Sequence, residues 1–212
     1  FFVYYTIDRE RMQKFRNDFE RMYASVMENC CREMLRRDTR SRDLRACVIF
    51  YSYTGVTRSV AESLRNASGC DLVEVKTQTP YSTFTAYTTG VFRSRKIACD
   101  QIEPDEIDVS GYDLLIIGTP VWAWHPAPAI NAAIRALKGC EGKTAVIFCT
   151  CCDKPGDALE ILGKSLRKRG VRVTAEIPLD ARDTKNPDAG GELLRRIIAA
   201  NPAGSLKEEI PG

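Results

Sequence analysis

Hydroxyl-bearing residues cluster directly after the first strongly apolar stretch of the chain. The hexapeptide SYTGVT occupies Ser52–Thr57, and a segment with helical periodicity begins within it. A turn of this kind presents free backbone N–H groups at the positive end of a helix dipole, and its hydroxyls can add further hydrogen bonds. An ordinary Ser/Thr helix cap would need only one of these residues. We therefore predict that Ser52–Thr57 binds a phosphate without requiring a cation.

Two tryptophans follow a second apolar stretch. The sequence GTPVWAWHP, residues Gly118–Pro126, places Trp122 and Trp124 in one turn at the end of a predicted strand. Rings at such a position point away from the layers that flank a sheet, so a planar aromatic ligand would use them. The alternative is that one of them packs under the following helix, and for Trp124 this alternative carries nearly equal weight.

A third loop contains three cysteines in the sequence CTCCDKP, residues Cys149–Pro155. A structural metal needs about four ligands in two clusters, and the remaining cysteines are scattered through predicted strands and helices, so we predict no metal site. The chain contains no GxGxxG motif, which leaves a dinucleotide-binding turn unsupported. With one histidine, His125, neither a catalytic triad nor an HExxH site has enough residues.

Strand and helix patterns alternate from Ala46 onward, which is typical of a parallel sheet covered by helices on both faces. The runs DLLIIG and TAVIFC are continuously apolar, as in central strands, whereas DLVEVKT alternates, as in a strand near an edge. The pattern predicts five strands, at 46–52, 71–77, 113–119, 143–150 and 170–177. It predicts helices at 56–67, 126–137, 155–169 and 190–200, and a less regular one within 80–96.

The two ends of the chain differ in sequence pattern from this alternating region. Residues 1–44 are predicted to form a helical extension, in which an apolar stripe over 8–37 packs on the core domain or on a second copy of itself as a homodimer. Residues 45–200 form the main domain, and 201–212 form a C-terminal tail. The long connection over 77–112 is either a binding loop or a ragged helix with a solvated acidic turn.

The composition limits the classes of partner that the protein is expected to bind. The 212 residues carry 31 basic and 28 acidic side chains, for a net charge of +3, with no stripe typical of nucleic-acid binding. No apolar run approaches the roughly 20 residues of a membrane helix, and the N-terminal sequence is a poor signal peptide. Nine cysteines, several within predicted strands, favour a reducing cytoplasm. We expect a cytoplasmic protein that binds neither nucleic acid nor membrane.

The loops at Ser52–Thr57 and Tyr112–Pro128 together resemble those of the flavodoxin-like FMN-binding family, specifically flavodoxin-family proteins and NAD(P)H-dependent oxidoreductases with a GTPVWAW-type second loop. The resemblance covers about Ala46 to Ala200. It implies a flavodoxin-like doubly wound α/β fold with five parallel strands in the order 2-1-3-4-5, and one non-covalent FMN. The implied phosphate contacts are Ser52, Tyr53, Thr54, Gly55, Val56 and Thr57. The implied ring contacts are Pro120, Val121, Trp122 and Ala123, with Trp122 closest, and Thr150, Cys151 and Cys152 at the pyrimidine edge.

Three functions remain open on this evidence. The first is an NAD(P)H-dependent reductase of quinone-like or other small acceptors, and the second is an electron carrier for a protein partner. Carriers of this family are typically strongly acidic, whereas residues 45–200 carry 20 bases and 18 acids, which favours the reductase. The third is a flavin-free interaction module that works through helix 8–37. His125 is a candidate proton or hydrogen-bond donor at the reactive edge of the flavin, or only a residue at the start of a helix.

Overall fold

The computed structural model describes residues 44–79, 81–82 and 89–201. The chain divides into two units, Phe1–Arg42 and Asp43–Gly212, and every described residue belongs to the second unit. The helix predicted over 8–37 lies outside the described residues, as does the predicted tail beyond Asn201. The homodimer predicted through that helix therefore stays a prediction.

Five parallel strands form the central sheet, in the order β2-β1-β6-β9-β10. This arrangement confirms the predicted order 2-1-3-4-5, with the continuously apolar β6 and β9 inside the sheet and β2 at an edge. The order reverses direction at β1, where ligands bind in doubly wound sheets. The bounds are β1 Ala46–Phe50, β2 Asp71–Glu74, β6 Leu114–Trp122, β9 Thr144–Thr150 and β10 Arg172–Leu179.

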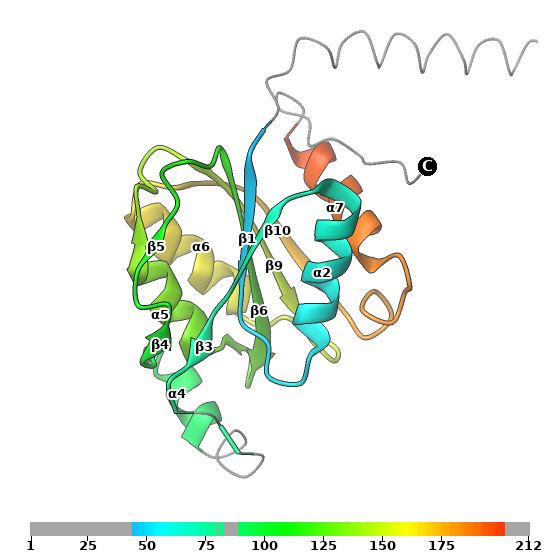
Figure 1. Ribbon diagram of the computed structural model, residues 1–212. Coiled ribbons are helices and arrows are strands. Elements are labelled where there is room, and N and C mark those ends of the chain that lie inside the picture. The colour runs from blue at the N-terminus through cyan, green and yellow to red at the C-terminus, as the bar shows by residue number, and fades with distance from the viewer. Residues whose placement is uncertain (1–43, 80, 83–88, 202–212) are drawn as a thin grey trace, which may run out of the picture. The chain divides into compact units, whose positions relative to one another are not determined.

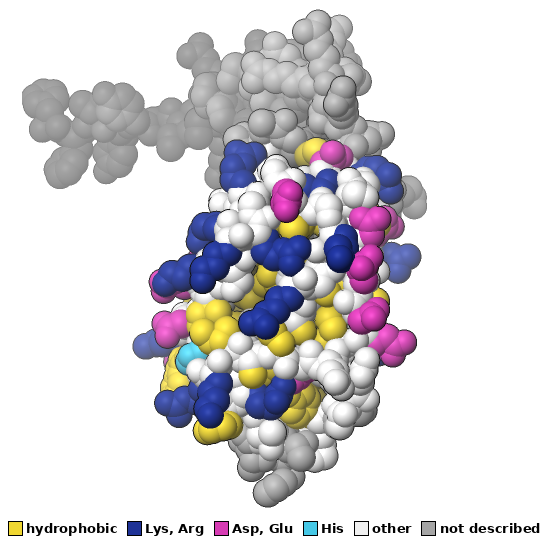
Figure 2. Space-filling model, turned by 90° about the vertical axis from the view of Figure 1, so that its left-hand side faces the viewer, with side chains coloured by type: hydrophobic (Ala, Val, Ile, Leu, Met, Phe, Trp, Pro, Cys, Tyr) yellow, Lys and Arg dark blue, Asp and Glu magenta, His cyan; other side chains and the backbone are white. Residues whose placement is uncertain are grey.

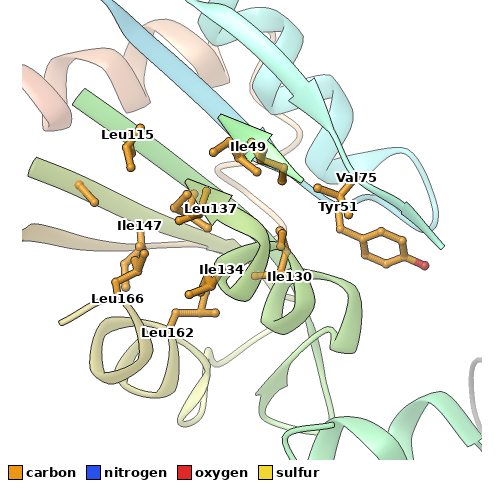
Figure 3. Close-up of a cluster of buried hydrophobic side chains, with 14 of the residues drawn as sticks. Ile49, Tyr51, Val75, Leu115, Ile130, Ile134, Leu137, Ile147, Leu162 and Leu166 are labelled. Carbon is orange, nitrogen blue, oxygen red and sulfur yellow. The ribbon is translucent and has the colours of Figure 1, made fainter. Parts of the chain in front are cut away.

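Helices cover both faces of this sheet (Figure 1). Because successive strand residues point to opposite faces, the apolar side chains of β1, β6 and β9 pack into two separate cores, one on each face of the sheet. One core lies against α5 and α6, where Ile130 and Leu162 meet Ile49 and Leu115 (Figure 3). The other core lies against α2 and α7. The bounds are α2 Val56–Ser68, α5 Pro128–Ala136, α6 Ala158–Lys168 and α7 Ala189–Ala200.

The long connection after β2 contains short elements only. The two-residue strands β3 (Lys76–Thr77) and β4 (Ile102–Glu103) pair antiparallel. Between them, α4 (Val91–Arg95) is a helix of five residues. The acidic part includes β5 (Ile107–Asp108), which pairs with β8 (Leu137–Lys138). The described part of this connection holds the short helix and acidic turn of the second interpretation, and Val91 also lines the cavity described below, as the first interpretation expects of a binding loop.

Besides the two-residue strands β4, β5 and β8, one further short strand was not predicted. Strand β7 (His125–Pro126) folds back antiparallel onto the end of β6, pairing Trp122 with His125 and Val121 with Pro126. It extends the sheet locally at its carboxyl edge. None of the described helices has the length and apolar character that crossing a bilayer requires.

Candidate functional site

A cavity of about 970 Å³ opens where the loops after β1, β6 and β9 meet. All three loops leave the carboxyl ends of parallel strands, so the sheet brings them to one edge. Every residue predicted to contact the cofactor lines this cavity except Ser52, whose hydroxyl is buried. The predicted residues in the lining are Tyr53, Thr54, Gly55, Val56, Thr57, Pro120, Val121, Trp122, Ala123, Thr150, Cys151 and Cys152.

The loop after β1 has the features of an anion site. Helix α2 begins with Gly55 as its N-cap, in a left-handed conformation at φ 90°, and no side chain caps its first N–H groups. No acidic residue lies in its first turn. The Ser52 hydroxyl is buried and has no hydrogen-bond partner. Since buried hydroxyls are normally paired, these groups together fit a bound phosphate, which would accept the unused hydrogen bonds.

Two buried threonine hydroxyls join the first and third loops. Thr57 Oγ1 lies 2.8 Å from Thr150 Oγ1, and both residues are buried at the cavity floor. Each hydroxyl can act as donor or acceptor, so the pair leaves one proton free to point toward a ligand. This contact bridges 93 positions of sequence. It fixes the start of α2 to the end of β9.

Tyrosines surround Trp122 edge-on. The ring centroids of Tyr51, Tyr53 and Tyr81 lie 6.0, 5.7 and 5.2 Å from that of Trp122, at interplanar angles of 78° to 90°. Gly90 lies so close that a Cβ added to it would come within 2.7 Å of the indole. Such edge-to-face packing is favourable and fixes the ring plane. Trp122 therefore lines the cavity as a rigid, half-buried wall.

A partly buried carboxylate, that of Asp100, holds Tyr81 against this wall. The Tyr81 phenol donates to Asp100 at 2.8 Å, and Arg93 forms an ion pair with the same carboxylate at 2.8 Å. Burial and the bond to Asp100 raise the pKa of Tyr81 to about 12, so the phenol stays neutral. The Ser94 hydroxyl donates to the carbonyl of Trp122 at 2.8 Å, which links α4 to the end of β6.

The turn between β6 and β7 is strained. Ala123 and Trp124 have φ values of 47° and 68°, in the left-handed region that two-residue hairpin turns require and that glycine or asparagine normally fills. The Trp124 carbonyl accepts from the Asp157 N–H at 2.9 Å, and Gly156 packs against the Trp124 backbone. The Trp124 side chain is nonetheless 62% exposed and lines the cavity. Strain of this kind, held by the surroundings, is characteristic of functional sites.

His125 lies beside the cavity but is not among its lining residues. Its Nδ1 is 2.7 Å from the carbonyl oxygen of Ala123, which holds the imidazole against the strained turn. The predicted role of His125 as a donor to the flavin remains a hypothesis, because this contact uses one ring nitrogen to brace the turn.

A family model described as flavodoxin matches residues 45–173, which is more than half of the chain. This protein belongs to the flavodoxin family. No curated protein matches the chain.

Solved structures of flavoproteins share the fold of this flavodoxin-family protein. A flavoprotein from Lactobacillus acidophilus, solved in complex with FMN, has a TM-score of 0.55 and 21% identity, and covers 64% of this chain and 93% of its own. A proposed flavoprotein from Bacteroides uniformis has a TM-score of 0.62 and 17% identity, and the match covers 73% of this chain and 99% of that one. A proposed flavoprotein from Bacteroides eggerthii has a TM-score of 0.60 and 24% identity, and the match covers 74% of this chain and 98% of that one. At these identities the likeness concerns the fold.

The cysteines of this flavodoxin-family protein differ sharply in accessibility along the third loop. Cys149 is buried, and burial raises the pKa of its thiol to about 12. Burial, followed by the nearby Asp180, also raises the pKa of the half-buried Cys151 thiol. Cys152 is exposed at the cavity. Among the described residues, no group of three or more His, Cys, Asp or Glu side chains could hold a metal ion.

Six residues of the lining are not among the predicted cofactor contacts. Trp124 was considered as a ligand contact and left open, and Ser59 and Val91 lie in or beside predicted helices. Ala181, Thr184 and Lys185 belong to the loop after β10, which no sequence pattern linked to the site. The one available signal was its place after the carboxyl end of the fifth strand, at the same edge of the sheet.

Proposed function

We propose that this protein is an FMN-binding oxidoreductase that takes electrons from NAD(P)H and reduces a quinone-like or other small acceptor. The observation that carries the proposal is the single cavity in which an anion-binding helix terminus and a rigid tryptophan wall lie at the same sheet edge. The cavity volume of about 970 Å³ is within the range of small-molecule sites. The complex of the Lactobacillus acidophilus flavoprotein with FMN, in a related fold, adds support.

The phosphate of FMN would be held by the first loop. The Ser52 hydroxyl and the uncapped N–H groups of α2 would donate to it, and the absence of acids in the first turn of α2 leaves the helix dipole unopposed. Thr57 and Thr150 would present the free proton of their shared pair. The space beside Gly55 is open, since no heavy atom lies within 4 Å of where a Cβ on this left-handed residue would be.

The ring of FMN would lie between the second and third loops. Bound FMN would supply reversible transfer of one or two electrons. The chain's part is to orient and desolvate it: Trp122 offers a fixed aromatic wall, Trp124 an exposed ring, and the segment from Thr150 to Cys152 a border of backbone groups and thiols. Backbone hydrogen bonds from this border would tune the flavin potential.

A second candidate function, an electron carrier for a protein partner, is favoured by one feature of the surface. Residues 128–172 contain nine Lys or Arg and four Asp or Glu, and they include both helices on one face of the sheet. Figure 2 shows Lys and Arg side chains distributed over this face. A basic face would steer an acidic partner toward the protein. This is the opposite sign to that of the acidic carriers in the family.

Two measurements test these functions in sequence. Flavin-free protein is first titrated with FMN and followed by quenching of flavin fluorescence; we expect one FMN per chain, and absence of binding would refute both functions. The loaded protein is then mixed anaerobically with NADH or NADPH. Bleaching of the flavin absorbance is expected for the reductase, whereas an FMN-loaded protein that neither nucleotide bleaches would leave the carrier.

A further inference from the structure

The loop between β10 and α7, residues 180–188, reaches the same cavity from the side of α2. Helix α7 starts against the middle of α2, because the Gly190 N–H donates to Ser63 Oγ at 3.1 Å and a Cβ on Gly190 would lie 2.2 Å from the Leu64 nitrogen. Ser63 lies one helical turn beyond Ser59, which lines the cavity. The loop before α7 therefore lies beside the N-terminal part of α2 (Figure 1).

Each acidic side chain of this loop already has partners. The Asp180 carboxylate accepts the N–H groups of Arg182 and Asp183 at 2.6 and 3.0 Å, which lowers the pKa of Asp180. Asp183 forms an ion pair with Arg196 at 3.2 Å, and Asp188 forms one with Arg195 at 3.0 Å. These contacts fold the loop and give each of its three negative charges a partner other than Lys185.

Lys185 is left with an uncompensated charge at the cavity. Its side chain is exposed, and no ion pair joins it to an acid of the described region. Among the described residues that line the cavity, Lys185 is the only one with a charged side chain. Two features of the first loop, the uncapped start of α2 and the unpartnered Ser52 hydroxyl, also favour an anion.

We propose that Lys185 binds the phosphate of FMN, so that the loop of residues 180–188 is a second phosphate-binding element beside Ser52–Thr57. This inference rests on the proposed function. It revises the expectation that the phosphate is held without a cation. An ammonium group adds a charge-assisted hydrogen bond to the neutral donors of the first loop, and it selects the phosphorylated flavin over riboflavin, which carries the same ring without the phosphate.

The test compares FMN with riboflavin in the full chain. Lys185→Gln should weaken FMN binding about tenfold, the lower end for a charge-assisted hydrogen bond, and change riboflavin binding less than twofold. Lys185→Arg should restore most of the FMN affinity. Lys168→Gln is the matched control, because it removes another exposed charge, from the C-terminal end of α6, and should leave both affinities unchanged.

Each alternative result is distinguishable. Unchanged FMN affinity in Lys185→Gln would overturn the inference and leave the proposed function standing. Equal weakening of FMN and riboflavin would also overturn it, since Lys185 would then act on the ring or the loop and not on the phosphate. Wild-type protein that binds neither flavin would refute the proposed function, and this inference with it.

Discussion

Replacing Gly55 by alanine isolates the backbone conformation that the loop after β1 requires. Gly55 has φ 90° and ψ −14°, and no heavy atom lies within 4 Å of the position that a Cβ would take. The substitution therefore meets no steric obstacle beyond its own backbone. Holding an alanine in the left-handed region costs about 1–2 kcal/mol.

Gly142 provides a matched control. It also has a positive φ, of 74°, and also has open space around its missing Cβ, but it lies before β9 at the amino end of the sheet, opposite the cavity. Gly142→Ala should lower the free energy of unfolding by about 1–2 kcal/mol, or the melting temperature by roughly 2–8 °C for a chain of this size. Gly55→Ala should lower the unfolding free energy of the flavin-free protein by less, because the empty loop can leave the left-handed conformation.

Only the Gly55 variant should change flavin binding. In the empty protein the loop can leave the left-handed conformation and relieve the strain, but a bound phosphate needs the loop restored. Binding then regains the full strain, so the Kd for FMN should rise about 5- to 30-fold. Thermal unfolding and titration by flavin fluorescence measure the two effects. A Gly55→Ala protein that is destabilised like Gly142→Ala yet binds FMN with wild-type affinity would refute this account of the loop.

Three further predictions concern the aromatic and thiol groups. Trp124→Ala removes an exposed ring and keeps the turn, so stability should change by less than about 0.5 kcal/mol while FMN binding weakens about 2- to 12-fold, by thermal unfolding and flavin titration. A maleimide should label Cys152 before Cys149, and bound FMN should slow that labelling, as peptide mass spectrometry would show; equal rates would contradict the burial difference. Because the pKa of Tyr81 is about 12, above the ordinary 10, its contribution to stability is complete below pH 10 and is lost toward pH 12; Tyr81→Phe should flatten that decline in alkaline unfolding curves.

Much of the sheet follows from local patterns. The runs in β6 and β9 are apolar on both faces, which requires two covering layers and therefore interior positions, and the alternating β2 lies at the edge. Loops after β1, β6 and β9 could be grouped because parallel strands end at one edge. The residue types in those loops then indicated a phosphate and a planar ring.

Long-range packing supplied what these patterns do not encode. The hairpin that forms β7 depends on two residues, Ala123 and Trp124, in conformations that their side chains disfavour, and local propensity argues against such a turn. It is held by Gly156 and Asp157, some thirty positions away along the chain. The wall around Trp122 likewise comes from tyrosines on two separate segments.

The sequence by itself determined the order of the elements and the chemistry of three loops, because both rest on periodicity and on residue types that act within a few positions. The tertiary structure alone decided that Lys185 lies at the cavity. Its place depends on α7 packing against α2, at a contact between Gly190 and Ser63 that joins residues 127 positions apart. No local pattern reports such a contact, since its stability comes from the close fit of two helices.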